Sequence, residues 1–495
     1  MKEKSLKKNA ILNIIRTLMS IIFPIITFPY ASKILLPEGI GKVNFVNSIV
    51  SYFTIISLLG IGTYGTRESA KYRDNKEELS KVCSEMLAIN VITTIIAYLL
   101  YFLFIFFNPS LQDYRVFLLI ASITILFSTF GIGWFYSGIE EYEYITIRTI
   151  IFQIVSIVLL FLFVKKKEDV LIYLLIGIIS NAGSNILNLI HSRKYINIRF
   201  NRKLELKKHL KPTFLLFSIA LITSIYNTLD TSMLGFLSTN QQVGYYTAAT
   251  KINKMILTLV TSISAVMFPR LSYYIKQNKM EDFNNLLHKN LSVIILISLP
   301  CTIGLNILSK PIVLLFSGTN FIPAVPIMKF MNPIIIIISL SNFIGSQVFV
   351  PLGKEKNTII AVTCGSIINF SLNLILIPKY FALGAAIATI TAESIVAIIQ
   401  IFNLKRIISL TSHLLEIVQY ILATAIMGII VKIFSNLIDS NILSILVCVL
   451  AGALIYYISL IILRNQIIIT LSKDLLIKLI NKKKSIMASW KHYNN

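Results

Sequence analysis

Apolar stretches of about twenty residues recur about fourteen times along this chain, and a short polar segment separates each from the next. A helix of that length, rising about 1.5 Å per residue, spans the hydrocarbon core of a bilayer. Helices satisfy their own backbone hydrogen bonds, which water cannot do inside that core. The pattern predicts an all-α, polytopic membrane protein with transmembrane segments at residues 10–31, 43–64, 84–107, 114–136, 145–164, 170–191, 213–236, 245–268, 290–308, 327–350, 358–377, 382–402, 415–434 and 442–463.

The composition agrees with a membrane protein. Of the 495 residues, 56% are apolar and only 14% are charged, and the mean hydropathy is +0.77. A soluble domain needs a more highly charged surface. The formal net charge of +24 raises the question of nucleic acid, but the basic residues lie mostly in alternate loops. We therefore expect no nucleic-acid partner.

The distribution of these basic residues predicts the orientation of the chain. The loops on the side of the two termini hold about 32 lysines and arginines, against about eight on the opposite side. Cytoplasmic loops carry the excess of positive charge, so both termini are expected in the cytoplasm. A run of three lysines at 165–167 goes against the trend, since it falls on the outer side.

The two halves of the chain look like a direct repeat. GIGKVNFVNSI (39–49) resembles QVGYYTAATKI (242–252), which aligns Gly41 with Gly244, and two later matches have similar offsets. Two repeats of six helices are expected to be related by an axis along the membrane normal, with the substrate path between them. The predicted regions are a six-helix lobe (1–192), a basic linker (193–212), a second six-helix lobe (213–406), helices 13 and 14 (407–464) and a basic amphipathic cytoplasmic tail (465–495).

Charged side chains inside apolar spans are costly and usually face an interior cavity. Cations outnumber acids among them, so such a cavity would attract anions, and a diphosphate suits arginine and lysine well. Simpler interpretations stay open: Arg148 could reach an interface, Asp230 could pair with a lysine, and Glu393 could be a helix contact or a proton-linked carboxylate. The candidate substrate-binding residues are Arg16, Arg148, Asp230, Lys251, Lys254 and Glu393.

Motifs for catalysis or metal binding are missing from the sequence. There is no GxxxxGK[ST], the five histidines lie at helix ends or in tails, and the four cysteines are far apart. We expect no enzymatic activity, no cofactor and no metal site.

Several segments resemble the Wzx-type polysaccharide flippases of the multidrug/oligosaccharidyl-lipid/polysaccharide exporter superfamily. They include FPYASKILLPEGIGKVNFVNSIVSYF (28–53), YNTLDTSMLGFLSTNQQVGYYTAATKI (226–252) and NLILIPKYFALGAAIATITAE (373–393). The resemblance implies two six-helix lobes in a V, with helices 13 and 14 appended. It also implies that undecaprenyl-diphosphate-linked oligosaccharides for capsule or O-antigen cross the bacterial cytoplasmic membrane by alternating access, through a cationic central cavity. Asp230 and Lys251 fall inside matching segments, and Arg16 lies in the matching first helix.

The resemblance further implies partners among polysaccharide polymerases and other assembly proteins, besides the lipid bilayer. Coupling to a proton or sodium gradient is common in this superfamily. A peptidoglycan-precursor flippase and a multidrug or cation antiporter share the fold and stay open as alternatives. A membrane glycan polymerase is a more remote one, because the outer loops show no catalytic cluster.

Overall fold

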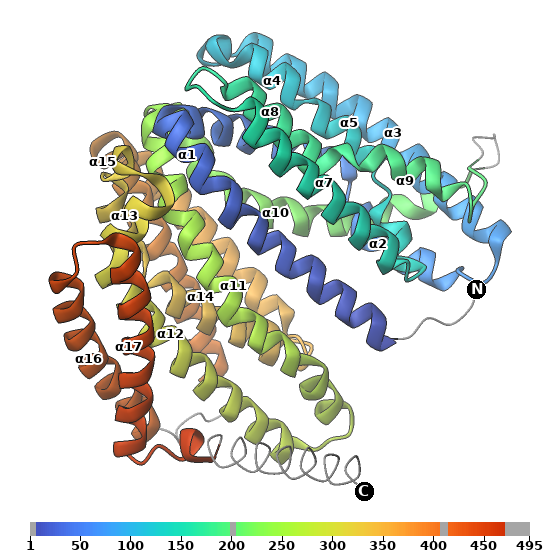
Figure 1. Ribbon diagram of the computed structural model, residues 1–495. Helices are drawn as coiled ribbons and strands as arrows, with labels where there is room; N and C mark the ends of the chain where they lie inside the picture. The colour runs from blue at the N-terminus through green and yellow to red at the C-terminus, as the bar shows by residue number, and fades with distance from the viewer. Residues whose placement is uncertain (1–5, 199–203, 406–413, 471–495) are drawn as a thin grey trace, which may run out of the picture. The chain divides into compact units, whose positions relative to one another are not determined.

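The computed structural model describes residues 6–198, 204–405 and 414–470, and all regular elements in these ranges are helical (Figure 1). Within them, 11 helices are long and apolar enough to cross a membrane, or up to 12 when a bent pair counts as one span. Each predicted segment overlaps one of these spans. The expected all-helical, polytopic fold is confirmed.

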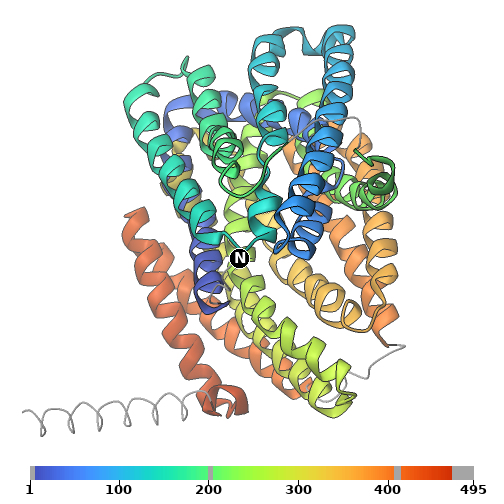
Figure 2. The same ribbon diagram turned by 90° about the vertical axis from the view of Figure 1, so that its right-hand side faces the viewer.

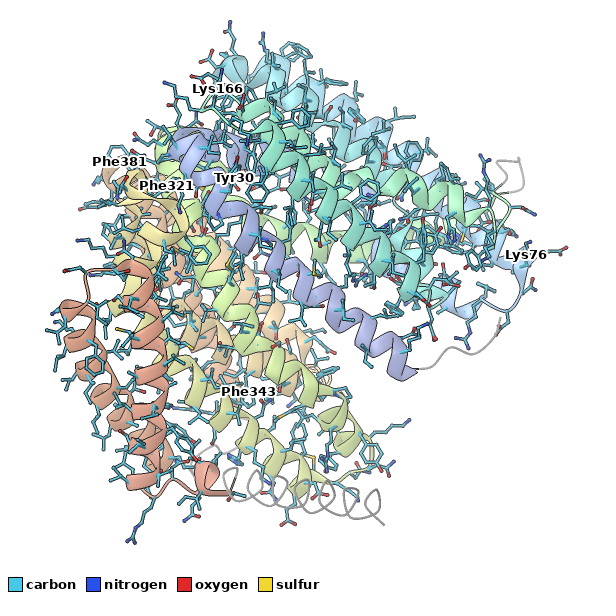
Figure 3. All side chains as sticks on the ribbon, in the orientation of Figure 1. Tyr30, Lys76, Lys166, Phe321, Phe343 and Phe381 are labelled. Carbon is cyan, nitrogen blue, oxygen red and sulfur yellow. The ribbon has the colours of Figure 1, made fainter. Side chains whose placement is uncertain are left out.

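Two of the spans are pairs of predicted segments joined at a sharp break. In α1 (Leu6–Leu58) the break is at Leu36, whose φ of 60° is left-handed. Leu36 precedes Pro37, and a residue before proline is disfavoured in the helical conformation. In α15 (Glu355–Lys405) the break is at Phe381, with a φ of 51°, three residues after Pro378 (Figure 3). Each of these two long helices therefore corresponds to two predicted segments that meet at the break.

The chain divides into two compact units. The first contains residues 1–251, 316–327 and 366–392. It is built around α1, which packs on several of its other helices. Its elements are α1, α2 (Ile61–Lys71), α3 (Lys76–Phe107), η1 (Pro109–Tyr114), α4 (Arg115–Ala121), α5 (Ile123–Thr129), α6 (Gly133–Gly138), α7 (Tyr142–Phe163), α8 (Val170–Ile178), η2 (Ile179–Gly183), α9 (Asn185–Ser192), α10 (Lys207–Leu237), η3 (Thr319–Phe321) and parts of α11 (Asn240–Lys276), α13 (Ala324–Met331) and α15.

The second unit contains residues 252–315, 328–365 and 393–495. Phe343, 1% exposed, lies in its hydrophobic core (Figure 3). The last two helices lie side by side (Figures 1 and 2), and the Tyr456 hydroxyl of α17 donates to the Leu296 carbonyl of α12 at 2.9 Å. Besides the remaining parts of α11, α13 and α15, its elements are α12 (Met280–Ser317), α14 (Ile334–Asn342), η4 (Phe343–Phe349), α16 (Leu414–Leu437) and α17 (Asn441–Ile462).

Glycines hold the start of α11 against α1 within the first unit. A Cβ atom on Gly41 would lie 1.7 Å from the Asn240 carbonyl oxygen, and one on Gly244 would lie 2.0 Å from the Pro37 carbonyl oxygen. The two glycines that the repeat aligns therefore make reciprocal backbone contacts. Only glycine allows backbones to approach this closely.

The compact units do not follow the halves of the repeat, because three pieces of the second half belong to the first unit. The predicted lobes 1–192 and 213–406 therefore stay a prediction. Parts of the predicted linker (199–203), of the start of the helix 13–14 region (406–413) and of the tail (471–495) lie outside the described residues.

Candidate functional site

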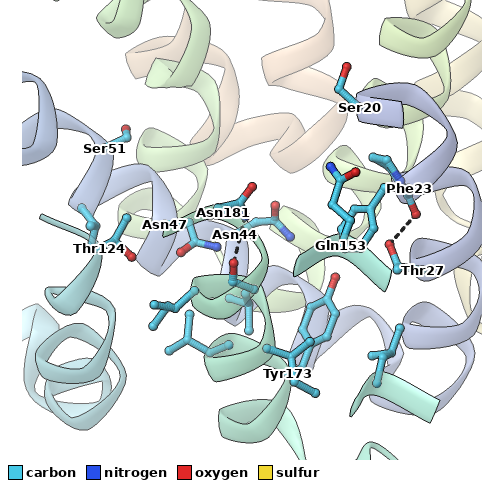
Figure 4. Close-up of a pocket in the computed structure, with 18 of the residues that line it drawn as sticks. Ser20, Phe23, Thr27, Asn44, Asn47, Ser51, Thr124, Gln153, Tyr173 and Asn181 are labelled. Carbon is cyan, nitrogen blue, oxygen red and sulfur yellow. Dashed lines mark hydrogen bonds between the residues drawn. The ribbon is translucent and has the colours of Figure 1, made fainter. Parts of the chain in front are cut away.

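The first unit contains a polar pocket of about 590 Å³ within its transmembrane helices (Figure 4). Both segments of α1 line it, together with α5, α7, α8, η2 and the last residue of this unit, Lys251. A volume in this range is typical of ligand sites.

A polar stripe on the second segment of α1 forms one wall. Asn44, Asn47, Ser51 and Thr54 all line the pocket, and their spacing of three and four residues places them on one helix face. Sequence reasoning missed these residues, although a polar stripe at helical spacing in an apolar span was a visible signal. The stripe lies between neighbouring apolar positions that pack against the rest of the unit.

Amide groups face the pocket from three elements (Figure 4). The side-chain NH2 of Asn44 donates to the Ile40 carbonyl at 2.7 Å, and that of Asn181 donates to the Gly177 carbonyl at 2.9 Å. Each amide carries two N–H donors and one acceptor oxygen, so each retains capacity for a ligand. Within the described residues, the Oε1 atom of Gln153 is buried and has no hydrogen-bond partner.

One of the predicted basic residues lines this pocket, and two others lie on helices that line it. Lys251 lines it, with its Nζ atom 4.5 Å from the centre of the Phe28 ring. Arg16 lies one helical turn before the lining residue Ser20 on α1, and Arg148 lies five residues before Gln153 on α7.

The guanidinium group of Arg148 makes few hydrogen bonds with the described residues. Its Nη1 atom is 3.5 Å from the Ser184 carbonyl, and its guanidinium lies 5.9 Å from the centre of the Tyr144 ring. Among the described residues, its buried Nε atom has no hydrogen-bond partner. An anionic ligand would supply the missing acceptor.

Asp230 lies in a separate buried cluster of the first unit. Its carboxylate accepts hydrogen bonds from Tyr246 at 2.6 Å, Thr389 at 2.7 Å, Asn369 at 3.0 Å and Asn373 at 2.7 Å. All four of these donors are neutral, so hydrogen bonds rather than a lysine compensate its burial. Two asparagines one turn apart in an apolar segment are the feature of the sequence that could have located this cluster.

The other two candidate residues belong to the second unit. Lys254 is exposed on α11, and Glu393 of α15 is 8% exposed. This unit also has a groove of about 460 Å³, lined mainly by apolar residues of α12, α16 and α17, with Ile256 of α11 and Ile468. Pro300, Leu308, Met427 and Val431 are among them. The groove suits a hydrocarbon chain, since it offers almost no polar partner.

Comparisons with known proteins agree with this architecture. The family described as "Polysaccharide biosynthesis protein" matches residues 6–275, and the family described as "MatE" matches residues 216–375. The "Putative O-antigen transporter" of Escherichia coli (strain K12) is 23% identical over 411 residues, which cover 81% of this chain and 97% of that protein. The "Capsular polysaccharide biosynthesis protein CapF" of Staphylococcus aureus is 26% identical over 388 residues, covering 75% and 92% respectively.

Solved structures share the fold. A structure described as "Lipid II flippase MurJ, inward closed conformation" matches with a TM-score of 0.75 at 20% identity, covering 92% of this chain and 100% of that one. An inward-facing multidrug resistance transporter of the MATE family matches with a TM-score of 0.62 at 12% identity, covering 81% and 99%.

Proposed function

The chain belongs to the polysaccharide biosynthesis protein family, a family of membrane transporters rather than enzymes, and we propose that it is a flippase for polyprenyl-diphosphate-linked oligosaccharides. In this proposal it moves the units across the bacterial cytoplasmic membrane for capsule or O-antigen assembly. The relatives named for O-antigen transport and capsule biosynthesis support this substrate class.

The observation that supports the proposal most is the polar pocket flanked by basic residues. An oligosaccharide that enters hydrocarbon loses hydrogen bonds to water, and each unpaired hydroxyl costs several kcal/mol on alkane-type scales, roughly 4–8. Amide and hydroxyl groups of the pocket replace those bonds. Lys251, Arg16 and Arg148 attract the diphosphate.

The apolar groove of the second unit supports a lipid-linked substrate in particular. A polyprenyl chain is hydrocarbon, and it stays in an apolar environment throughout transport when it occupies such a groove. The second unit thus contains a surface that matches the hydrocarbon part of such a substrate.

A multidrug exporter is the less favoured candidate. Carboxylates in a cavity attract organic cations, whereas the described residues that line the polar pocket include no carboxylate and one lysine. A peptidoglycan-precursor flippase handles a similar diphosphate, so the identity of the glycan that accumulates must separate the two functions.

The test is deletion of the gene in its native host. We expect lipid-linked oligosaccharides to accumulate on the cytoplasmic face and surface polysaccharide to fall, while cell-wall precursors stay normal. Unchanged surface polysaccharide with no accumulated intermediate would contradict the flippase proposal.

Complementation then tests the basic residues. Lys251→Ala should restore little surface polysaccharide at normal protein level, because the diphosphate loses its charge partner in the pocket. Lys432→Ala is the matched control, since Lys432 also lies in a transmembrane helix but is exposed on α16. Full complementation by Lys251→Ala would remove the charge-based part of the mechanism.

A further inference from the structure

We propose that the polar pocket of the first unit contains a subsite for a neutral sugar residue, formed by the amides of Asn44, Asn47, Gln153 and Asn181. The inference rests on the proposed function and adds to it the part of the substrate that this pocket recognises. In this proposal the basic residues bind the diphosphate and the amides bind the glycan.

The chemistry of the amides fits sugar hydroxyls. A hydroxyl both donates and accepts a hydrogen bond, and a carboxamide offers two donors and an acceptor in fixed positions. Four carboxamides that line one pocket from three elements can therefore engage several hydroxyls, or an acetamido group, of one ring. The four amides are uncharged, and Lys251 is the one charged residue among the described lining, so the amides suit a neutral sugar and give an acidic one no charge partner.

The buried oxygen of Gln153 is the second observation. Buried polar atoms are nearly always hydrogen-bonded, and an unpartnered one in a native protein calls for an explanation. The Oε1 atom of Gln153 has no partner among the described residues, although its side chain lines the pocket. A ligand hydroxyl, or water in its absence, supplies the missing donor.

The rest of the lining fits a pyranose ring as well. Tyr173 and Phe23 present aromatic surface to the pocket opposite polar groups (Figure 4), and the C–H face of a sugar ring packs on such surface. Gly177 also lines the pocket, and a Cβ atom at this position would meet no atom within 4 Å. The space beside Gly177 is therefore open to a ligand.

The experiment compares two kinds of probe on purified protein in lipid nanodiscs. The first probe is polyprenyl diphosphate without sugar. The second is polyprenyl diphosphate bearing one hexose or one N-acetylhexosamine. Isothermal titration of both gives the ratio of their affinities, which measures the contribution of the sugar separately from that of the lipid and the diphosphate.

We expect wild-type protein to bind at least one sugar-bearing probe more tightly than the bare one. Gln153→Leu and Asn181→Leu should each reduce that ratio by roughly three- to tenfold, the effect of one or two hydrogen bonds. Gly177→Leu should abolish the preference for the sugar-bearing probe, because the leucine side chain fills the pocket. Gln153→Leu and Asn181→Leu should leave binding of the bare probe unchanged.

Asn227→Leu is the matched control, because Asn227 is exposed on α10 and its side chain donates to the carbonyl four residues earlier, as that of Asn181 does. It should leave both affinities unchanged. Equal wild-type affinity for all probes would overturn the sugar subsite and leave the flippase function standing. Parallel loss of both affinities in Gln153→Leu and Asn181→Leu would also overturn it, and no binding of any probe would instead contradict the proposed function.

Discussion

The carboxylate of Asp230 is held by four neutral hydrogen-bond donors from α11 and both segments of α15. An ionised group in a buried site is costly unless hydrogen bonds replace its hydration. Once they do, removing the carboxylate leaves the donors without an acceptor, which costs about 1–3 kcal/mol for each one left unpaired. Asp230 is therefore expected to hold these helices together.

Asp230→Ala should lower the melting temperature of the purified protein in detergent markedly, because several buried donors lose their acceptor at once. Asp230→Asn should lower it less, since its amide oxygen still accepts and the hydroxyls of Tyr246 and Thr389 can rotate. Thermal unfolding followed by tryptophan fluorescence measures both variants. Equal melting temperatures for wild type and Asp230→Ala would show that the cluster does not stabilise the unit.

Sequence alone could identify Asp230 but not its surroundings. A charge within an apolar span is conspicuous because of its cost. Asn369 lies 139 residues away from it in the chain, and only the packing of α10 on α15 brings the two together. Asn44, Asn47 and Gln153 were missed for a different reason, because neutral amides in a span carry no charge. The stripe with Asn44 and Asn47 is visible in the sequence, but only the placed helices bring Gln153 to the same pocket.

Among the elements, the contact between α1 and α11 is the tightest approach of two helix backbones described above. Three hydrogen bonds also hold segments from the second half of the chain within the first unit. Ser32 donates to the Phe316 carbonyl at 3.0 Å, Tyr114 donates to the Asn240 side chain at 2.8 Å, and the Ala382 amide donates to the Gln242 side chain at 3.3 Å. If the orientation predicted from charge is right, this contact closes the outer end of the first unit.

Gly41→Ala and Gly244→Ala should each weaken that closure, because the added methyl group would lie within about 2 Å of a carbonyl oxygen. We expect a cysteine placed at Asn47, in the pocket, to react faster with an impermeant thiol reagent added outside cells when either alanine is present.

Gly62→Ala is the control for these variants, since a Cβ atom there meets nothing within 4 Å. Its labelling rate should equal that of the parent. Unchanged labelling in both glycine variants, with normal protein level, would mean that the contact does not control access to the pocket.

The same contact shows where prediction of elements from sequence stops. Hydropathy located the spans, and the repeat aligned Gly41 with Gly244. The alignment treated them as equivalent positions in separate halves, whereas in the structure each packs on backbone near the start of the helical segment that carries the other. Symmetry in a sequence says which positions are equivalent, but not which of them touch.

For the molecule as a whole, orientation in the membrane is the prediction that most of the mechanism depends on. Lys76, at the start of α3, and Lys166, between α7 and α8, lie at opposite ends of the first unit (Figure 3). The charge distribution puts Lys76 in the cytoplasm and Lys166 outside, although Lys166 belongs to the run of lysines that goes against the trend.

Local structure explains how that run is accommodated. The Asp169 carboxylate accepts the backbone amides of Lys165 and Lys166, both at 2.8 Å. These two hydrogen bonds lower the pKa of Asp169, so the carboxylate stays ionised at neutral pH and offsets part of the positive charge. Lys167 also lies 3.9 Å from Glu168. The loop therefore presents less net charge than its three lysines suggest, and it counts weakly against the predicted orientation.

Cysteine labelling decides the orientation. In a background with the four native cysteines replaced by alanine, Lys166→Cys should react with an impermeant reagent on intact cells, and Lys76→Cys should react only after permeabilisation. The two lysines are matched, since both are exposed at an end of the same unit, Lys76 at the start of α3 and Lys166 between α7 and α8. The reverse labelling pattern would mean that the orientation is opposite to the predicted one. The α1–α11 contact would then lie at the cytoplasmic end, and the substrate would have to enter the pocket from the end opposite Arg16.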